Sequence, residues 1–351
     1  MNKIKYLNGL KGIGAIMVFL CHYHLMGFPM SSWMSTNPYA SLLIDGGFAV
    51  AFFIIISGFT AWLSVERKFH DKALLSQMAV NRYFRFAVPF GVAFIMMFIA
   101  WHLGAFDYHV EAGNLSGSET LKTAFWPVSI VGFIKALLLS PVNPDFWDAP
   151  LWMMKYVFFG TYIAIIVRMG IDNMSPKCKL LALVVVLVLF GIGDIFYLGI
   201  LMGFLFSYLY KQPVSTPKKQ MWGQILFILF LIIRWKFPVN ASVEVKNFSM
   251  AIVLLLAIYL LPFLQRILES RPLQYLGKIS FSIYIFHWPI MGAFTSYVYV
   301  KVHSFPYAFP VVFGLTFVAV ILFSHLSERF IERGVSNFVI KRINRFLFVP
   351  K

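Results

Sequence analysis

Ionisable side chains within strongly apolar segments are the residues of this sequence that can do chemistry. His22 lies deep in the first apolar segment, and Lys11 precedes it by eleven positions. In an α-helix this offset places both side chains on one face, within about 20° of each other and about 16 Å apart along the axis. His22 is therefore a candidate general base reaching into a buried cavity. The alternative is an interfacial lysine with a packed histidine, which is also the role we expect for His24.

A second polar stripe lies in the last third of the chain. Ser280, Tyr284 and His287 are four and three residues apart, so they project from one helical face. Three polar groups on one stripe of a membrane helix are expected to face inward, which makes Tyr284 and His287 catalytic candidates. Ser57 is another candidate, although Ser57 and Gly58 are also a pair of small residues typical of close helix packing.

Two arginines three residues apart, Arg82 and Arg85, share a helical face. Paired guanidinium groups suit phosphate oxygens, so these residues are candidates for binding a phosphate-bearing donor. Ordinary anchoring of a membrane helix by cations is the alternative. Lys155 and Tyr156 begin another apolar segment, where Lys155 can reach the membrane surface or face a cavity beside Tyr156.

These residues belong to a chain that is far more apolar than a soluble domain. Its 351 residues are 60% hydrophobic and 13% charged, with a mean hydropathy of +0.78, whereas soluble domains carry about 25% charged residues. A bilayer is the natural solvent for so much apolar surface. The net charge is +16, but the basic residues lie in short loops between apolar runs, so we expect no nucleic-acid partner. Cys21 and Cys178 match no metal or redox spacing, and we expect no metal ion.

The apolar runs predict an all-α polytopic membrane protein with about ten transmembrane helices and both termini in the cytoplasm. The first run is expected to be a true helix rather than a cleaved signal peptide, because it continues into further spans. This orientation places 23 of the 30 lysines and arginines on the cytoplasmic side, which favours it over its inverse. The predicted spans are 9–28, 43–64, 84–104, 150–168, 180–194, 195–210, 222–237, 249–265, 279–300 and 307–326.

Two segments lie outside these spans. The stretch 105–149 falls on the outer side and holds an apolar piece, 128–140, which is short for a span and is expected to lie in the interface or re-enter. The tail 329–351 is basic and amphipathic, so we expect it to rest on the inner leaflet beyond a transmembrane domain formed by 1–328.

The order and spacing of these motifs resemble the membrane-bound acyltransferase-3 family. The resemblance runs from Asn8 to about Glu332. It rests on Lys11-x10-His22, Phe53…Ser57-Gly58-Phe59, Arg82-x-x-Arg85, Leu151-Trp152…Lys155-Tyr156, Leu276-Gly277-Lys278-Ile279-Ser280…Tyr284…His287-Trp288-Pro289 and Ser327-Glu328-Arg329. It implies about ten helices and transfer of an acyl group, usually acetyl, from a cytoplasmic coenzyme A thioester to hydroxyls of glycans and other acceptors.

Some positions depart from the family pattern. Ala51 stands where many members have an acid before the Ser-Gly-Phe segment, and Val157 stands where many have a glutamate after Lys-Tyr. If either acid orients the histidine in the family, this chain must do so differently, and Asp45 and Glu328 are the candidates. We expect the stand-alone membrane type of the family, without the extracellular hydrolase-like domain that many members carry.

The resemblance implies that Lys11 and His22 are essential and that Arg82 and Arg85 are important. The expected protein is a multi-pass O-acetyltransferase of the bacterial cytoplasmic (inner) membrane, acting on surface polysaccharide or a lipid-linked sugar. No permanently bound cofactor is expected, and acetyl-CoA or another acyl-CoA is the donor substrate.

The donor is expected to meet Arg82 and Arg85, with Lys155 and Tyr156 also near its path. Ser57, Tyr284 or Lys155 can donate a hydrogen bond to the developing oxyanion. Transfer can be direct or pass through an acyl-histidine. One alternative is a transporter or flippase for a lipid-linked or small acidic solute, and another is a membrane assembly or sensor protein without catalysis.

Overall fold

A computed structural model of the protein describes residues 4–127, 129–139, 141–142, 148–210, 216–236 and 244–348. These residues form helices and no β-strand, which confirms the all-α prediction for the described part of the chain. The helices are α1 (Lys5–Leu25), α2 (Ser31–Thr36), α3 (Pro38–Leu43), α4 (Gly46–Lys68), α5 (Lys72–His102), α6 (His109–Ser116), α7 (Glu119–Thr123), α8 (Ile130–Leu139), η2 (Ala149–Met153), α9 (Met154–Gly170), α10 (Pro176–Gly193), α11 (Ile195–Tyr210), α12 (Pro217–Lys236), α13 (Glu244–Leu260), α14 (Pro262–Leu268), α15 (Arg271–Ile290), η3 (Met291–Thr295), α16 (Ser296–Val302), α17 (Ala308–Ser327), η4 (Glu328–Val335) and α18 (Ser336–Leu347).

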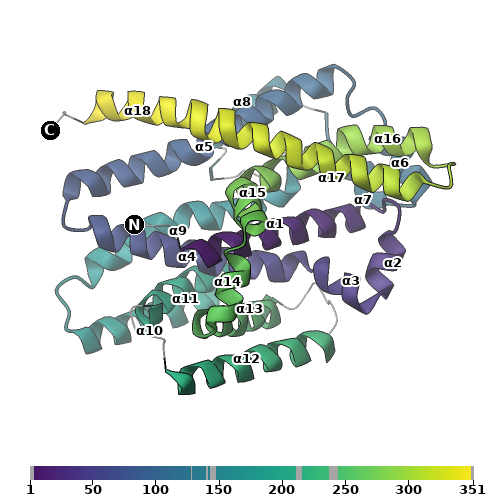
Figure 1. The fold of residues 1–351 in the computed structure, drawn as a ribbon. Helices are drawn as coiled ribbons and strands as arrows, with labels where there is room; N and C mark the ends of the chain where they lie inside the picture. Colours follow the sequence, from purple (N-terminus) through teal and green to yellow (C-terminus); the bar gives the residue numbers. More distant parts are fainter. Residues whose placement is uncertain are drawn as a thin grey trace.

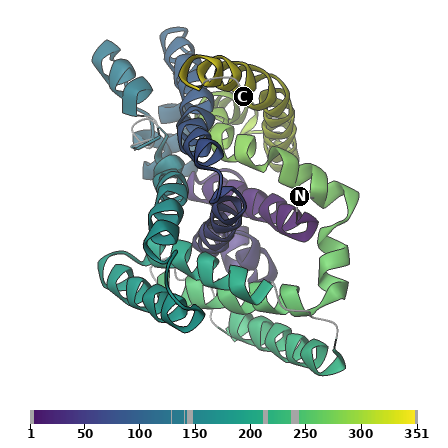
Figure 2. The ribbon, with the colours of Figure 1, turned by 90° about the vertical axis from the view of Figure 1, so that its left-hand side faces the viewer.

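The centre of the bundle is formed by α1, α4 and α15 (Figure 1). The most extensive packing of α1 is against α15, while α4 contacts α1, α9, α11 and α13. Most of α4 is buried, because its sequence is apolar on every side and only a central position covers all of it. Figure 2 turns the bundle by 90° and shows α1 enclosed by the other helices.

Four helical stretches in the described part of the chain are long and apolar enough to cross a membrane. They are 38–68, 72–102, 149–170 and 308–347, and a fifth is added if α13 and α14, bent by 101° at a short break, form one span. All ten predicted segments contain a helix, and the count of four or five covers only the described residues. The number of ten spans and the orientation of the termini stay predictions.

The final stretch is a single long helical rod made of α17, η4 and α18, which runs along α5 near its end (Figure 1). Its 40 residues correspond to about 60 Å at the helical rise, twice the roughly 30 Å of a bilayer core. Val318 and Leu322 are strongly exposed on α17, as expected for a face that meets lipid. The predicted tail is helical as far as Leu347, and its contact with the inner leaflet stays a prediction.

The apolar piece predicted at 128–140 contains the ten-residue helix α8, and residues 128 and 140 lie outside the described part. It packs against α5. A helix of this length covers about 15 Å, half of a bilayer core, which agrees with the prediction that this piece does not span.

Candidate functional site

Close packing of α1 against α15 sets the geometry of the site. The two helices run parallel and in register, since Asn8 Nδ2 donates to the Gln274 carbonyl at 3.2 Å near their starts and His22 meets His287 near their ends. A Cβ added to Gly12 would lie 2.6 Å from the amide nitrogen of Gly277, and one added to Gly277 would collide with the Asn8 carbonyl. Only glycine at these positions lets the backbones approach this closely.

The register brings the two predicted catalytic histidines into direct contact. His22 Nδ1 lies 2.8 Å from His287 Nε2, and the rings are stacked with centroids 5.0 Å apart. His287 is fully buried, whereas His22 retains some exposure. We call this contact the histidine pair.

The hydrogen bonds determine the tautomers of the neutral histidine pair. His287 Nδ1 lies 2.9 Å from the Ile283 carbonyl, which can only accept, so Nδ1 carries the proton. His287 Nε2 is then an acceptor, and His22 Nδ1–H donates to it. The lone pair of a neutral His22 is therefore on Nε2, and no other described residue forms a hydrogen bond with that atom. This is the arrangement that a general base requires.

Aromatic rings surround the histidine pair. The indole of Trp288 meets the His22 ring edge-on at 5.2 Å, and the Tyr284 ring lies 6.0 Å from His287. The Tyr284 hydroxyl is buried and donates to the Pro150 carbonyl. Tyr284 thus lies beside His287 with its proton engaged by the backbone of η2, and its catalytic role stays a prediction.

Ser57 lies on α4 and Lys11 lies on α1. Among the described residues, no hydrogen bond joins either side chain to the histidine pair. The Ser57 hydroxyl donates to the Phe53 carbonyl at 2.7 Å within α4. The neighbouring Gly58 packs against the Ile200 carbonyl of α11, where a Cβ would collide. The small pair therefore serves close helix packing, the alternative considered for it. Lys11 is half-buried on α1.

Arg82 and Arg85 diverge from one another. The Arg82 guanidinium donates to the Val157 carbonyl of α9 and lies 4.6 Å from the Phe86 ring, while its Nε is buried without a hydrogen-bond partner. Arg85 is exposed, and it is close enough to Arg82 and Lys68 to interact with both electrostatically. Lys68, Arg82 and Arg85 thus lie together at one end of the bundle, and the Glu332 carboxyl is close enough to Arg85 to interact with it. We call the three cations the positive cluster.

The positive cluster and the histidine pair lie at different heights along the bundle. The Phe86 and Phe281 rings meet at 5.8 Å, which places these two residues at one level of the bundle. Arg82 lies one turn before Phe86, and His287 lies six residues after Phe281. The two sites are therefore about 15 Å apart along the bundle.

Lys155 and Tyr156 lie on the first turn of α9 and make other contacts. The Lys155 ammonium is 5.1 Å from the Tyr156 ring, and the Tyr156 hydroxyl donates to Asp194 at 2.8 Å. Among the described residues, no hydrogen bond or ion pair joins either side chain to Arg82 or Arg85. Their predicted part in donor binding stays a prediction.

The two acids considered as substitutes for Ala51 and Val157 have other partners. Asp45 forms a buried ion pair with Arg234 and caps α4 by accepting from the Phe48 amide at 2.9 Å. Glu328 is paired with Lys278 at 3.1 Å and with Arg333. Neither acid reaches His22, and the Nδ1 of His22 is oriented by His287 instead. The sequence placed His287 on an inward stripe but not opposite His22, since the register of two helices 265 residues apart is a tertiary property.

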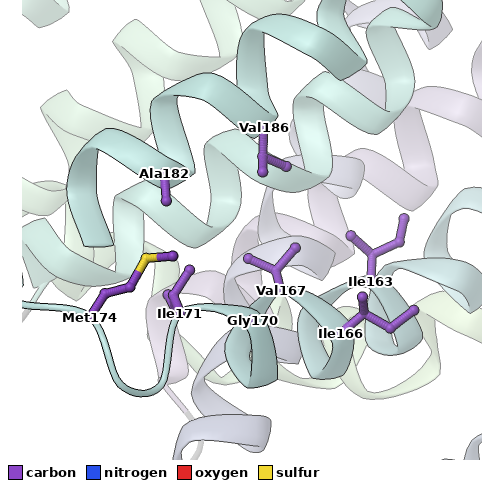
Figure 3. Close-up of a pocket in the computed structure, with 8 residues that line it drawn as sticks. All are labelled: Ile163, Ile166, Val167, Gly170, Ile171, Met174, Ala182 and Val186. Atoms are coloured by element: carbon purple, nitrogen blue, oxygen red, sulfur yellow. The ribbon is translucent and has the colours of Figure 1, made fainter. Parts of the chain in front are cut away.

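A groove of about 370 Å³ lies between α9 and α10 (Figure 3). Every lining residue is apolar: Ile163, Ile166, Val167, Gly170, Ile171, Met174, Ala182 and Val186. With no polar side chain, the groove offers nothing to a phosphate or a sugar, and it agrees with a surface that meets lipid chains.

The fold and site can now be compared with known proteins. The model of the acyltransferase-3 family, described as an acyltransferase domain, matches residues 4–326. The chain belongs to the acyltransferase-3 family, as the motifs predicted. No solved structure matches it.

Two characterised relatives are named O-acetyltransferases. The O-acetyltransferase OatA of Staphylococcus aureus is 28% identical over 131 residues, covering 36% of this chain and 20% of OatA. The O-acetyltransferase PaAT-1 of Phomopsis amygdali is 22% identical over 369 residues, covering 83% of this chain and 73% of PaAT-1. The chain thus matches about a fifth of OatA and most of PaAT-1.

Proposed function

We propose that this protein is a membrane O-acyltransferase that moves an acetyl group from cytoplasmic acetyl-CoA to a hydroxyl of a glycan or lipid-linked sugar. The observation that carries the proposal is the histidine pair, in which His22 is held with a free Nε2 lone pair. Family membership and the names of both relatives agree with O-acyl transfer.

In the proposed reaction, His22 Nε2 accepts the proton of the acceptor hydroxyl as its oxygen attacks the thioester carbonyl. The resulting tetrahedral intermediate collapses with cleavage of the carbon–sulfur bond, and the His22 proton passes to the departing thiolate. The products are the O-acetyl ester and free coenzyme A. His287 keeps the His22 ring in the productive tautomer throughout, as orienting groups do for other catalytic histidines.

The positive cluster is the proposed site for the donor phosphates. Arg85 is exposed, and Arg82 uses one Nη on the Val157 carbonyl, which leaves further N–H groups of its guanidinium for an anion. A nucleotide held here projects its pantetheine arm about 15 Å toward the histidine pair, by the helical rise given above. The donor then enters from the cytoplasmic end and the acceptor from the opposite end, under the predicted orientation.

The first test replaces His22. His22→Ala should reduce acetyl transfer by about 10²-fold or more, the usual contribution of a positioned base. Its unfolding temperature in the presence of acetyl-CoA should equal that of the wild type. His102→Ala is the matched control, because His102 is an exposed histidine bonded to the Phe98 carbonyl. Full activity of His22→Ala would disprove the assignment.

The second test measures donor binding. Acetyl-CoA should raise the unfolding temperature of the wild type, and the double variant Arg82→Gln/Arg85→Gln should lose most of this shift. Arg345→Gln, which changes an exposed arginine on α18, should retain it. A solute transporter would show no stabilisation by coenzyme A, and equal shifts in all three proteins would exclude the positive cluster as the phosphate site.

A further inference from the structure

One buried acid near the histidine pair is unused by this mechanism. Asp148 precedes η2 and is only 1% exposed, and among the described residues neither of its carboxyl oxygens has a hydrogen-bond partner. Its backbone carbonyl accepts from the Leu151 amide at 2.9 Å, so the segment is locally fixed. A buried carboxyl without a partner is costly to a fold, and such groups are retained where a ligand or solvent supplies the missing bond.

The position of Asp148 points to the acceptor. Two residues further on, the Pro150 carbonyl accepts from Tyr284, which ties η2 to α15 next to the histidine pair. Asp148 is close enough to Tyr284 to act on it electrostatically, and Tyr284 lies 6.0 Å from His287. Arg82 and Arg85 lie at the other end of the site, so Asp148 is on the side away from the donor phosphates.

A carboxyl in this place suits a hydroxyl group. It can accept from one hydroxyl while His22 Nε2 faces another, and an acceptor with neighbouring hydroxyls satisfies both. Burial raises the pKa of Asp148 well above its usual range, which favours the neutral acid that can also donate.

We propose that Asp148 binds the acceptor, hydrogen-bonding a second hydroxyl of a polyhydroxylated substrate beside the hydroxyl that receives the acyl group. The proposal rests on the proposed O-acyltransferase function and names the residue by which the enzyme distinguishes a sugar acceptor from a simple alcohol. It assigns Asp148 to acceptor recognition, with no part in donor binding or proton transfer.

The test uses the purified full-length protein with acetyl-CoA and two acceptors that share an alkyl chain, octyl β-glucoside and 1-octanol. The wild type should acetylate the glucoside preferentially. Asp148→Leu should raise the KM for the glucoside by about tenfold, the effect of losing a substrate hydrogen bond, without changing its KM for acetyl-CoA. Asp148→Asn, which retains neutral hydrogen-bonding groups, should stay close to the wild type. Glu111→Leu, at an exposed acid of α6, is the control.

Two further readouts separate the possible failures. Hydrolysis of acetyl-CoA without acceptor and stabilisation by acetyl-CoA should be equal in the wild type and in Asp148→Leu. If both are lost only in Asp148→Leu, the residue is structural and the proposal is wrong. It is also wrong if octanol serves as well as the glucoside, if the KM for the glucoside is unchanged, or if Asp148→Asn behaves like Asp148→Leu. A wild type that neither binds nor hydrolyses acetyl-CoA contradicts the proposed function itself.

Discussion

Replacement of His287 tests whether the histidine pair works as a unit. His287→Leu removes the acceptor of the His22 Nδ1–H bond, which measures 2.8 Å, and nothing else described on α15 takes its place. His287→Gln keeps a carbonyl oxygen that can accept this proton. The Val18 carbonyl one turn earlier on α1 also acts on the His22 ring as a hydrogen-bond acceptor. The two variants therefore differ in whether position 287 still holds the His22 Nδ1–H.

The expected magnitude follows from what is lost. A neutral hydrogen bond contributes about 1 kcal/mol net, which is roughly fivefold in rate if it is lost only in the transition state. The proton of His22 can then also move to Nε2, which removes the base in part of the molecules, while complete loss of a base costs about 10²–10⁴-fold. We expect kcat of His287→Leu to fall by about 10- to 100-fold and that of His287→Gln by less than about tenfold.

The assay is steady-state release of coenzyme A with acetyl-CoA varied. The KM for acetyl-CoA should not change, because the histidine pair lies about 15 Å from the positive cluster by helical rise. His303→Leu is the control, since the His303 Nδ1 also bonds a backbone carbonyl, that of Val300 at 2.9 Å, but on an exposed residue. Wild-type kcat in His287→Leu, or equal loss in His287→Gln and His287→Leu, would refute the orienting role.

Two further predictions concern the packing around the site. Gly277→Ala should lower the free energy of unfolding by about 1–3 kcal/mol and reduce activity, because its Cβ would collide with the Asn8 carbonyl. Gly314→Ala is the control, since its Cβ would have nothing within 4 Å, and it should be neutral or slightly stabilising in thermal unfolding. Asp45→Ala should destabilise by about 3–5 kcal/mol through the unpaired Arg234, and Asp45→Ala/Arg234→Leu should recover part of that loss. Equal stability of the two glycine variants, or no recovery in the double variant, would contradict these accounts.

The sequence indicated which residue types could do chemistry in this protein. It did not indicate which side chains form pairs with one another. His22 and His287 stood out because ionisable groups in apolar helices are costly and rarely without a role. Asp45 and Glu328 were considered for orienting His22, but each has a cation nearby that only the fold supplies: Arg234 and Lys278. The sequence does not single out Asp148, because burial cannot be seen in a segment with no helical period.

The sequence by itself indicated that this protein belongs in a lipid bilayer, that it is helical, and which family it resembles. Those properties depend on apolar content, on local periodicity and on motif order, which the chain carries without any long-range contact. Only the tertiary structure decided that His22 faces His287, that the Ile283 carbonyl sets the tautomers of both rings, and that Arg82 turns inward while Arg85 stays exposed. The reason is physical: these relations depend on the distance between α1 and α15, which is set where Gly12 and Gly277 let two backbones touch.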